Sequence, residues 1–144
     1  MEANHMNTPT ALVNWLQNFL AQFHATAGTI HWHEDGGLRL AAAINIPVPI
    51  QEVVAWVPNG KGMAGLALQR REPVYTCNLK DADSGAVRPG AKLVDARGAV
   101  AIPVPDPAGN VRAVVGIAFP EEREFAGAEL ERLIEAASTL PPVG

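Results

Sequence analysis

The chain has few of the features that would place it outside ordinary globular proteins. Its single cysteine, Cys77, cannot form a disulfide within the chain and fits a reducing compartment. No apolar run approaches the roughly 20 residues that a membrane-spanning helix requires. The formal net charge of −4 argues against nucleic acid and anionic membranes as partners. Because Glu2 comes early and no basic segment precedes an apolar run, we expect no signal peptide and a cytoplasmic protein.

The length and apolar content predict one domain with a core of its own. The chain has 144 residues, of which 48% are hydrophobic, so disorder is not expected. No internal repeat or low-complexity tract divides it. We therefore predict a flexible lead over 1–9, a single domain over 10–140 and a short tail over 141–144.

Hydrophobic periodicity predicts a mixture of helices and strands. Apolar residues three and four positions apart predict helices at both ends of the chain, and alternating segments flanked by Asp-Gly and Pro-Ala-Gly-Asn predict two hairpins. Between them lies a polar, turn-rich segment that is long for a compact domain. The predicted elements are helix 9–24, strands 29–33 and 38–44, short helix 50–56, helix 63–70, strand 74–76, long loop 77–97, strands 99–104 and 111–119, and helix 125–140.

A glycine-rich turn near the middle of the chain has the spacing G-x-G-x-x-G, at Gly60, Gly62 and Gly65. In a dinucleotide-binding fold this pattern follows a buried strand at the start of a βαβ unit. Here the preceding residues 48–56 are interrupted by proline and are better read as a short helix. The turn leads instead into a short helix that Pro73 stops, followed by the strand 74–76. We therefore reject a nucleotide-binding fold of that type.

This succession of elements resembles a GAF domain over nearly the full chain. The resemblance depends on the central glycine turn, the segment "REPVYTCNL", the strand 100–104, the turn at Asp106 and Gly109, and Phe125 ahead of the last helix. It implies an α+β fold with a central antiparallel sheet. The N- and C-terminal helices would pack on one face, and the short helices with the long loop would enclose a small-molecule pocket on the other. Members often form dimers through their terminal helices.

The resemblance also indicates where ligand-binding residues would lie. Lys61 could bind an anion together with nearby backbone amides, or be a solvated turn lysine. The indole of Trp56 could cap the pocket or fill the core, and the thiol of Cys77 could be a redox sensor or a small buried side chain. The acidic residues and arginine of the loop could contact a ligand or only solvent. The candidate pocket residues are Trp56, Lys61, Met63, Cys77, Asp81, Asp83, Asp95 and Arg97.

Two histidines, His31 and His33, lie on one face of their predicted strand, and Trp32 lies on the other. A histidine pair could bind a metal ion or the edge of a haem, but no third ligand supports either. We therefore expect a partly exposed pair on the sheet surface and predict no metal site.

The better-defined activities of the family fit this sequence poorly. The free methionine-R-sulfoxide reductases need a nucleophilic and a resolving cysteine, because the sulfenic acid is reduced through a disulfide. Ala64 and Val54 stand at or near two of their cysteine positions, and Cys77 matches none. The residue set of cyclic-nucleotide-binding members cannot be placed, and Cys77 is not followed by the histidine typical of bilin attachment. The cofactor is unknown.

Three functions remain open. The first is a non-enzymatic sensory module that binds a small molecule and signals through a homodimer or a partner protein. The second is a divergent methionine-R-sulfoxide reductase, which the single cysteine disfavours. The third is a structural dimerisation unit whose pocket is filled by Trp56, Met63 and Leu66. We rank them in this order, with the sensory module only modestly ahead of the structural unit.

Overall fold

The computed structural model describes residues 9–76, 98–121 and 124–141. Six strands form one antiparallel sheet in the order β3-β2-β1-β6-β5-β4. None of the helices in these ranges is long and apolar enough to cross a membrane. The elements are α1 (Pro9–Phe23), β1 (Ala27–Glu34), β2 (Gly37–Ile44), α2 (Val48–Val53), β3 (Trp56–Pro58), α3 (Gly62–Arg70), β4 (Val74–Thr76), β5 (Gly98–Pro105), β6 (Val111–Phe119) and α4 (Gly127–Ala137).

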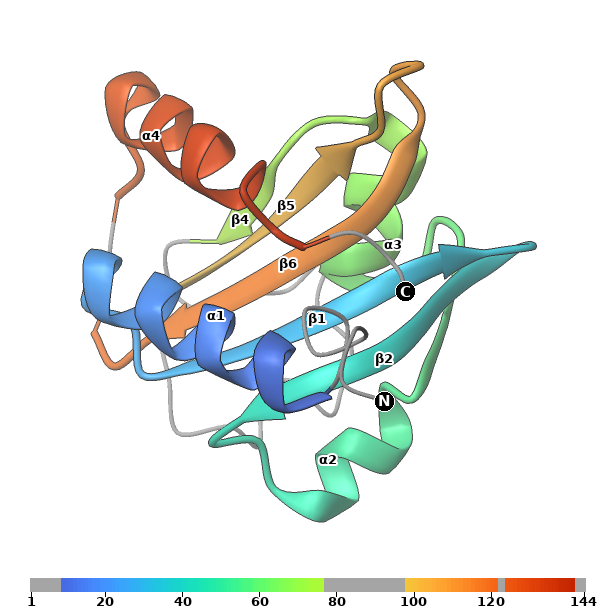
Figure 1. Ribbon diagram of the computed structural model, residues 1–144, viewed down its shortest axis with the longest axis horizontal. Coiled ribbons are helices and arrows are strands. Elements are labelled where there is room, and N and C mark those ends of the chain that lie inside the picture. The colour runs from blue at the N-terminus through green and yellow to red at the C-terminus, as the bar shows by residue number, and fades with distance from the viewer. Residues whose placement is uncertain (1–8, 77–97, 122–123, 142–144) are drawn as a thin grey trace.

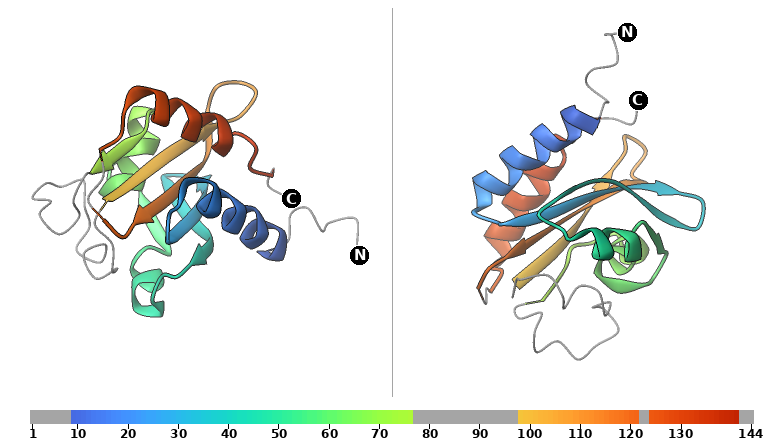
Figure 2. Two further views of the ribbon diagram at one scale, coloured as in Figure 1. Left: turned by 90° about the vertical axis from the view of Figure 1, so that its left-hand side faces the viewer. Right: turned by 90° about the horizontal axis from the view of Figure 1, so that it is seen from below.

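The helices cover the two faces of the sheet in pairs. The terminal helices α1 and α4 lie side by side on one face, in front of the sheet in Figure 1, and α2 and α3 lie on the other face (Figure 1, Figure 2). This arrangement confirms the predicted α+β fold with a central antiparallel sheet and its terminal helices together on one face. Because successive side chains of a strand point to opposite faces, each strand contributes to two separate cores.

The core between the sheet and the terminal helices is built from large apolar side chains. Leu16, Ile102 and Leu133 are fully buried there, and they come from α1, β5 and α4 respectively. Trp15 of α1 donates a hydrogen bond from Nε1 to Oγ1 of Thr139, 3.0 Å away, which joins α1 to the turn that follows α4. Beyond the end of α4, Arg112 of β6 donates to the Leu140 carbonyl at 2.7 Å and fixes the chain exit to the sheet.

Helix α2 and the residues that follow it differ from the prediction. The helix begins earlier, at Val48, because prolines are tolerated in the first helical turn, and it ends at Val53. Trp56, predicted to be helical, begins strand β3 and pairs with Arg39 of β2. A three-residue edge strand gives no periodic signal in the sequence, so only its partner β2 reveals it. The last helix is also shorter than predicted, since it spans Gly127–Ala137.

The glycine turn is needed for the close approach of α3 to β3. Gly60 and Gly62 have φ of 85° and 65°, in the left-handed region that glycine adopts without strain. Gly65 lies against the backbone of the preceding segment, and a Cβ at this position would be 2.5 Å from the Pro58 carbonyl oxygen. The Gly60 amide also donates to the Gly65 carbonyl at 2.9 Å. The three glycines therefore hold the turn against the first turns of the helix.

We predict that Gly65→Ala lowers the free energy of unfolding by about 1–3 kcal/mol, the usual range for overpacking. The added methyl group would collide with backbone atoms that cannot move independently of β3. Gly127→Ala is the matched control, because an added Cβ there has no neighbour within 4 Å and alanine favours a helix. Chemical denaturation of both variants measures the effect. Equal stabilities would show that the close approach is unimportant.

Candidate functional site

The face of the sheet beneath α2 and α3 has a floor of small residues. On this side the central strands β1 and β6 and the adjacent β5 present alanine and glycine in paired positions, Ala27 with Ala118, Ala118 with Ala99, and Gly116 with Ala101. We call this set the small-residue floor: Ala27, Ala99, Ala101, Gly116 and Ala118. The other side of the same strands carries valine, isoleucine and phenylalanine. The difference in side-chain volume leaves more space on the α2/α3 side than on the α1/α4 side.

The floor is incompletely covered although it lies at the middle of the sheet. Gly116 and Ala118 belong to a central strand but are only partly buried, as is the neighbouring Thr29 of β1. Ile50 of α2 and Met63 of α3 pack over the end of the floor formed by Ala27, Ala99 and Ala118. A central strand beneath two helices would normally be sealed by large side chains. This partial exposure marks the floor as the candidate site.

His31 is the one buried polar or charged residue among the described parts of the chain. Its side chain is 3% exposed and lies on the α2/α3 side, in the row of paired residues with Leu40 of β2 and Val114 of β6. One ring nitrogen, Nε2, is 2.9 Å from the Val54 carbonyl oxygen, in the segment between α2 and β3. The other nitrogen, Nδ1, is buried and has no hydrogen-bond partner within the described residues. Buried polar atoms are rarely left in this condition.

The contact with Val54 fixes the tautomer of His31. A carbonyl oxygen only accepts hydrogen bonds, so Nε2 must carry the proton and donate it. In the neutral ring, Nδ1 then has a lone pair and is a hydrogen-bond acceptor. Burial lowers the pKa of His31 from its ordinary 6.5, and the hydrogen bond to Val54 opposes this shift. The ring is therefore neutral at pH 7, and its free acceptor lies on the same side of the sheet as the floor.

Thr29 adds a second polar group on this face. It lies two residues before His31 on β1, so the two side chains are about 7 Å apart along the strand. A Cβ added to Gly116, its partner on β6, would be 3.0 Å from the Thr29 hydroxyl oxygen. Glycine at position 116 therefore keeps the space beside this hydroxyl open.

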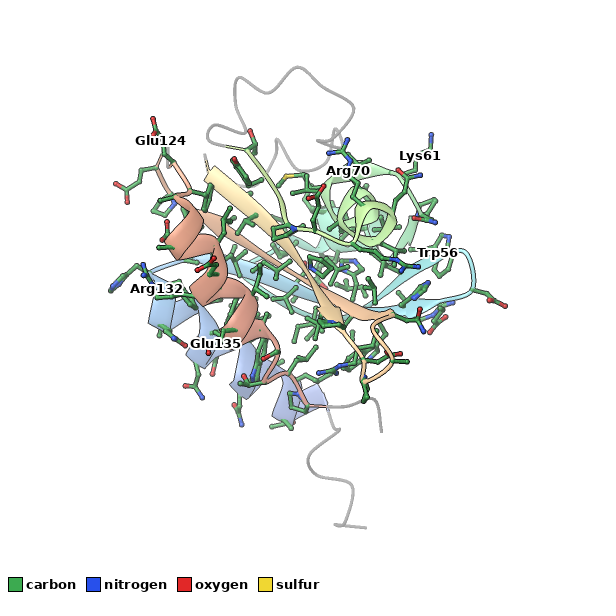
Figure 3. The ribbon with its side chains drawn as sticks, turned by 90° about the horizontal axis from the view of Figure 1, so that it is seen from above. Trp56, Lys61, Arg70, Glu124, Arg132 and Glu135 are labelled. Atoms are coloured by element: carbon green, nitrogen blue, oxygen red, sulfur yellow. The ribbon has the colours of Figure 1, made fainter. Side chains whose placement is uncertain are left out.

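The structure places the predicted candidates Lys61, Met63 and Trp56 in three different settings. Lys61 precedes the first residue of α3 and points away from the body of the protein (Figure 3). Met63 packs against both apolar clusters of the α2/α3 side. Trp56 is 37% exposed, and its pairing with Arg39 puts it on the opposite side of the sheet. There the Arg39 guanidinium lies 5.4 Å from the centre of its indole ring.

The other candidates, Cys77, Asp81, Asp83, Asp95 and Arg97, lie outside the described residues. The histidine pair differs from the expectation of a partly exposed pair, since His31 is buried and only His33 is exposed. His33 is held by a 2.8 Å hydrogen bond between Nδ1 and the Val111 carbonyl oxygen. No group of three potential metal ligands occurs within the ranges that the structure describes.

Comparison with known proteins assigns the family. A family model described as "GAF domain" matches residues 7–140. The chain belongs to the GAF domain family. The match covers the predicted domain together with the three residues before it. No curated protein matches the chain.

Solved GAF structures have the same fold. The GAF domain of a phosphoenolpyruvate-protein phosphotransferase from Coxiella burnetii is 22% identical, with a TM-score of 0.77, and the match covers 96% of this chain and 83% of that one. A type II free methionine-R-sulfoxide reductase from Thermoplasma acidophilum is 15% identical, with a TM-score of 0.70 and coverages of 95% and 90%. A domain of a putative two-component sensor histidine kinase from Sinorhizobium meliloti is 16% identical, with a TM-score of 0.71 and coverages of 91% and 85%. At these sequence identities, the similarity shows a shared fold and nothing about function.

The two polar residues of this GAF domain's candidate site, His31 and Thr29, were not on the predicted list, and neither were the residues of the small-residue floor. The alternation of the strand correctly put His31 and His33 on one face, but it did not reveal which face α2 and α3 would cover. A usable signal was present in the other strands. The alanines and glycine of 99–101 and 116–118 alternate with larger residues, which indicates one face with little side-chain volume.

We predict that the protein loses stability as the pH falls below 6.5, in part through His31. The folded-state pKa of this residue lies below its unfolded value of 6.5, so between these two values the unfolded chain binds more protons. The free energy of unfolding therefore decreases over this window and levels off, for this group, below the folded pKa. Denaturation at a series of pH values measures the slope.

His31→Gln is the matched variant, because glutamine reaches the Val54 carbonyl with an amide that does not titrate. Carboxylates contribute equally to both proteins, so the difference between the two pH profiles isolates the histidine. Parallel profiles would contradict the proposed neutral, buried state of His31.

Proposed function

We propose that this GAF domain is a non-enzymatic sensory module that binds a small molecule on its α2/α3 side. The observation that carries the proposal is Nδ1 of His31, an acceptor with no partner within the described residues, on the same side of the sheet as a partly exposed floor of small residues. A buried polar atom without a partner costs free energy, which a ligand supplying the missing hydrogen bond would recover. The sensor-kinase domain among the similar folds is consistent with a regulatory role.

The alternative functions have less support. Sulfoxide reduction through a disulfide requires two thiols, whereas the sequence has one cysteine. A purely structural unit would have a face filled by Met63, Leu66 and Trp56. Trp56 lies on the other side of the sheet, so of these three side chains Met63 and Leu66 alone pack on this face.

The ligand is tested by native mass spectrometry of the protein purified from its own host. We expect a small-molecule adduct in the gentle spectrum, and we expect Ala118→Leu to reduce its occupancy because the larger side chain would fill the floor. Ala108→Leu is the control, since Ala108 is exposed in the turn between β5 and β6. No adduct, together with no stabilising compound in a thermal-shift screen of metabolites, would contradict the proposal.

We further propose that the module forms a homodimer through the outward faces of α1 and α4 and passes its signal to a partner protein or through the dimer. Ile134 is a large apolar residue, 37% exposed, on α4, where Arg132 and Glu135 also point outward (Figure 3). An exposed apolar side chain within a polar helix surface is suited to a helix–helix contact.

We predict that Ile134→Asp converts the dimer to a monomer, because a charge buried in an apolar contact is costly. Glu131→Ala is the control, at an exposed position on the same helix. Sedimentation velocity distinguishes the two states. A wild-type monomer, or an Ile134→Asp dimer of unchanged affinity, would refute this interface.

A further inference from the structure

His31 defines the chemistry of the ligand more closely than the fold does. We propose that the site selects uncharged ligands that present a hydrogen-bond donor, an amide N–H or a hydroxyl O–H, to Nδ1 of His31. This inference rests on the proposed function, because it assumes that the ligand binds on the small-residue floor. It goes beyond that function by naming the group that the protein recognises and the class of ligand that it rejects.

The hydrogen bond that Nε2 makes decides whether Nδ1 donates or accepts. Nε2 is committed as a donor to the Val54 carbonyl at 2.9 Å, so the neutral ring can only accept at Nδ1. An amide or hydroxyl group satisfies this acceptor. A carboxylate oxygen would instead place its lone pairs against that of Nδ1, and neither group could donate. The tautomer thus distinguishes an amide from the carboxylate of the same shape.

The surroundings of His31 favour a small and uncharged ligand. The described residues that pair with His31 on either side, Leu40 and Val114, are apolar. Neither supplies a charge to balance an ion, and burying an unpaired charge is strongly unfavourable. Thr29, about 7 Å along the same strand, offers a hydroxyl that can donate or accept. The alanines and glycine of the floor leave a flat surface suited to a planar ring or an amide group.

Entry of a ligand requires a side chain to move, since Nδ1 is buried in the structure. We assign this movement to Met63. Its side chain is only partly buried and packs at the boundary of the two apolar clusters on this face, above the floor. Methionine is unbranched and changes rotamer at small cost. Met63→Ala should therefore speed the binding of small ligands without reversing their selectivity.

The test uses matched pairs of small molecules that differ in the group offered to Nδ1. Benzamide with benzoate and nicotinamide with nicotinate are suitable, because each pair has one ring and replaces an amide with a carboxylate. Each compound is titrated at pH 7.5 into protein labelled with nitrogen-15. The ring nitrogen resonances of His31 report the tautomer and the hydrogen bond. We expect both amides to shift the Nδ1 resonance and both carboxylates to leave it unchanged at the same concentration.

Three variants distinguish a role of His31 in binding the ligand from a role in the fold alone. His31→Gln keeps a donor for Val54 but carries its one acceptor, Oε1, on the same terminal amide and so has none at the position of Nδ1. Amides should therefore bind roughly tenfold more weakly, as expected for one neutral hydrogen bond. His31→Asn places an amide near the position of Nδ1 that can turn to donate or accept, so the preference for amides should disappear. His33→Gln changes the neighbouring histidine, which is exposed and bonded to Val111, and should not alter binding.

The outcomes distinguish this inference from the function on which it rests. Fragments that perturb Thr29, Gly116 and Ala118 without moving the His31 resonances would overturn the role of His31 and leave a ligand site on the floor. Preferential binding of the carboxylates, or an Nδ1-protonated tautomer in the free protein, would also overturn it. If no fragment perturbs the floor and native mass spectrometry shows no adduct, both the inference and the proposed function fail.

Discussion

The structure depends on a sheet whose two faces differ in side-chain volume. The central strands β1 and β6 alternate between large residues, such as Ile30 and Val115, and small ones, such as Ala27 and Gly116. Because the side chains of a strand alternate with a period of two, this pattern produces two different surfaces from the same backbone. The terminal helices pack closely on the large side. The short helices cover the small side, where central residues remain partly exposed.

The Val54 carbonyl links this sheet to the segment that covers it. Its hydrogen bond with His31 connects β1 to the chain between α2 and β3, and the Leu40 amide donates to the adjacent Ala55 carbonyl at 3.0 Å. A ligand that bonds to Nδ1 would act on the same imidazole ring that holds Val54. Ligand binding and the position of the α2–β3 segment would therefore be coupled through one side chain. This would provide a physical route from a buried ligand to a surface element.

The fold could be largely predicted because its signals are local. The apolar stripe of α1, the hairpin turn at Asp35 and Gly36, and the glycine turn before α3 each specify their own geometry. Strand β3 could not be predicted, since three residues have no periodicity and are extended only by pairing with β2. The candidate site could be predicted less well. For Trp56 the sequence left open a cap over the pocket or a place in the core, and its pairing with Arg39 places it on the other face.

By itself, the sequence determined the family, the order of the main elements, and the placement of His31 and His33 on one side of a strand. Only the tertiary structure decided that His31 is buried while His33 is exposed. It also decided that Nε2 of His31 is committed to Val54, 23 residues away, and that Nδ1 has no partner within the described residues. The physical reason is that periodicity fixes the face of a residue. Burial and hydrogen-bonding partners depend on which distant segment covers that face.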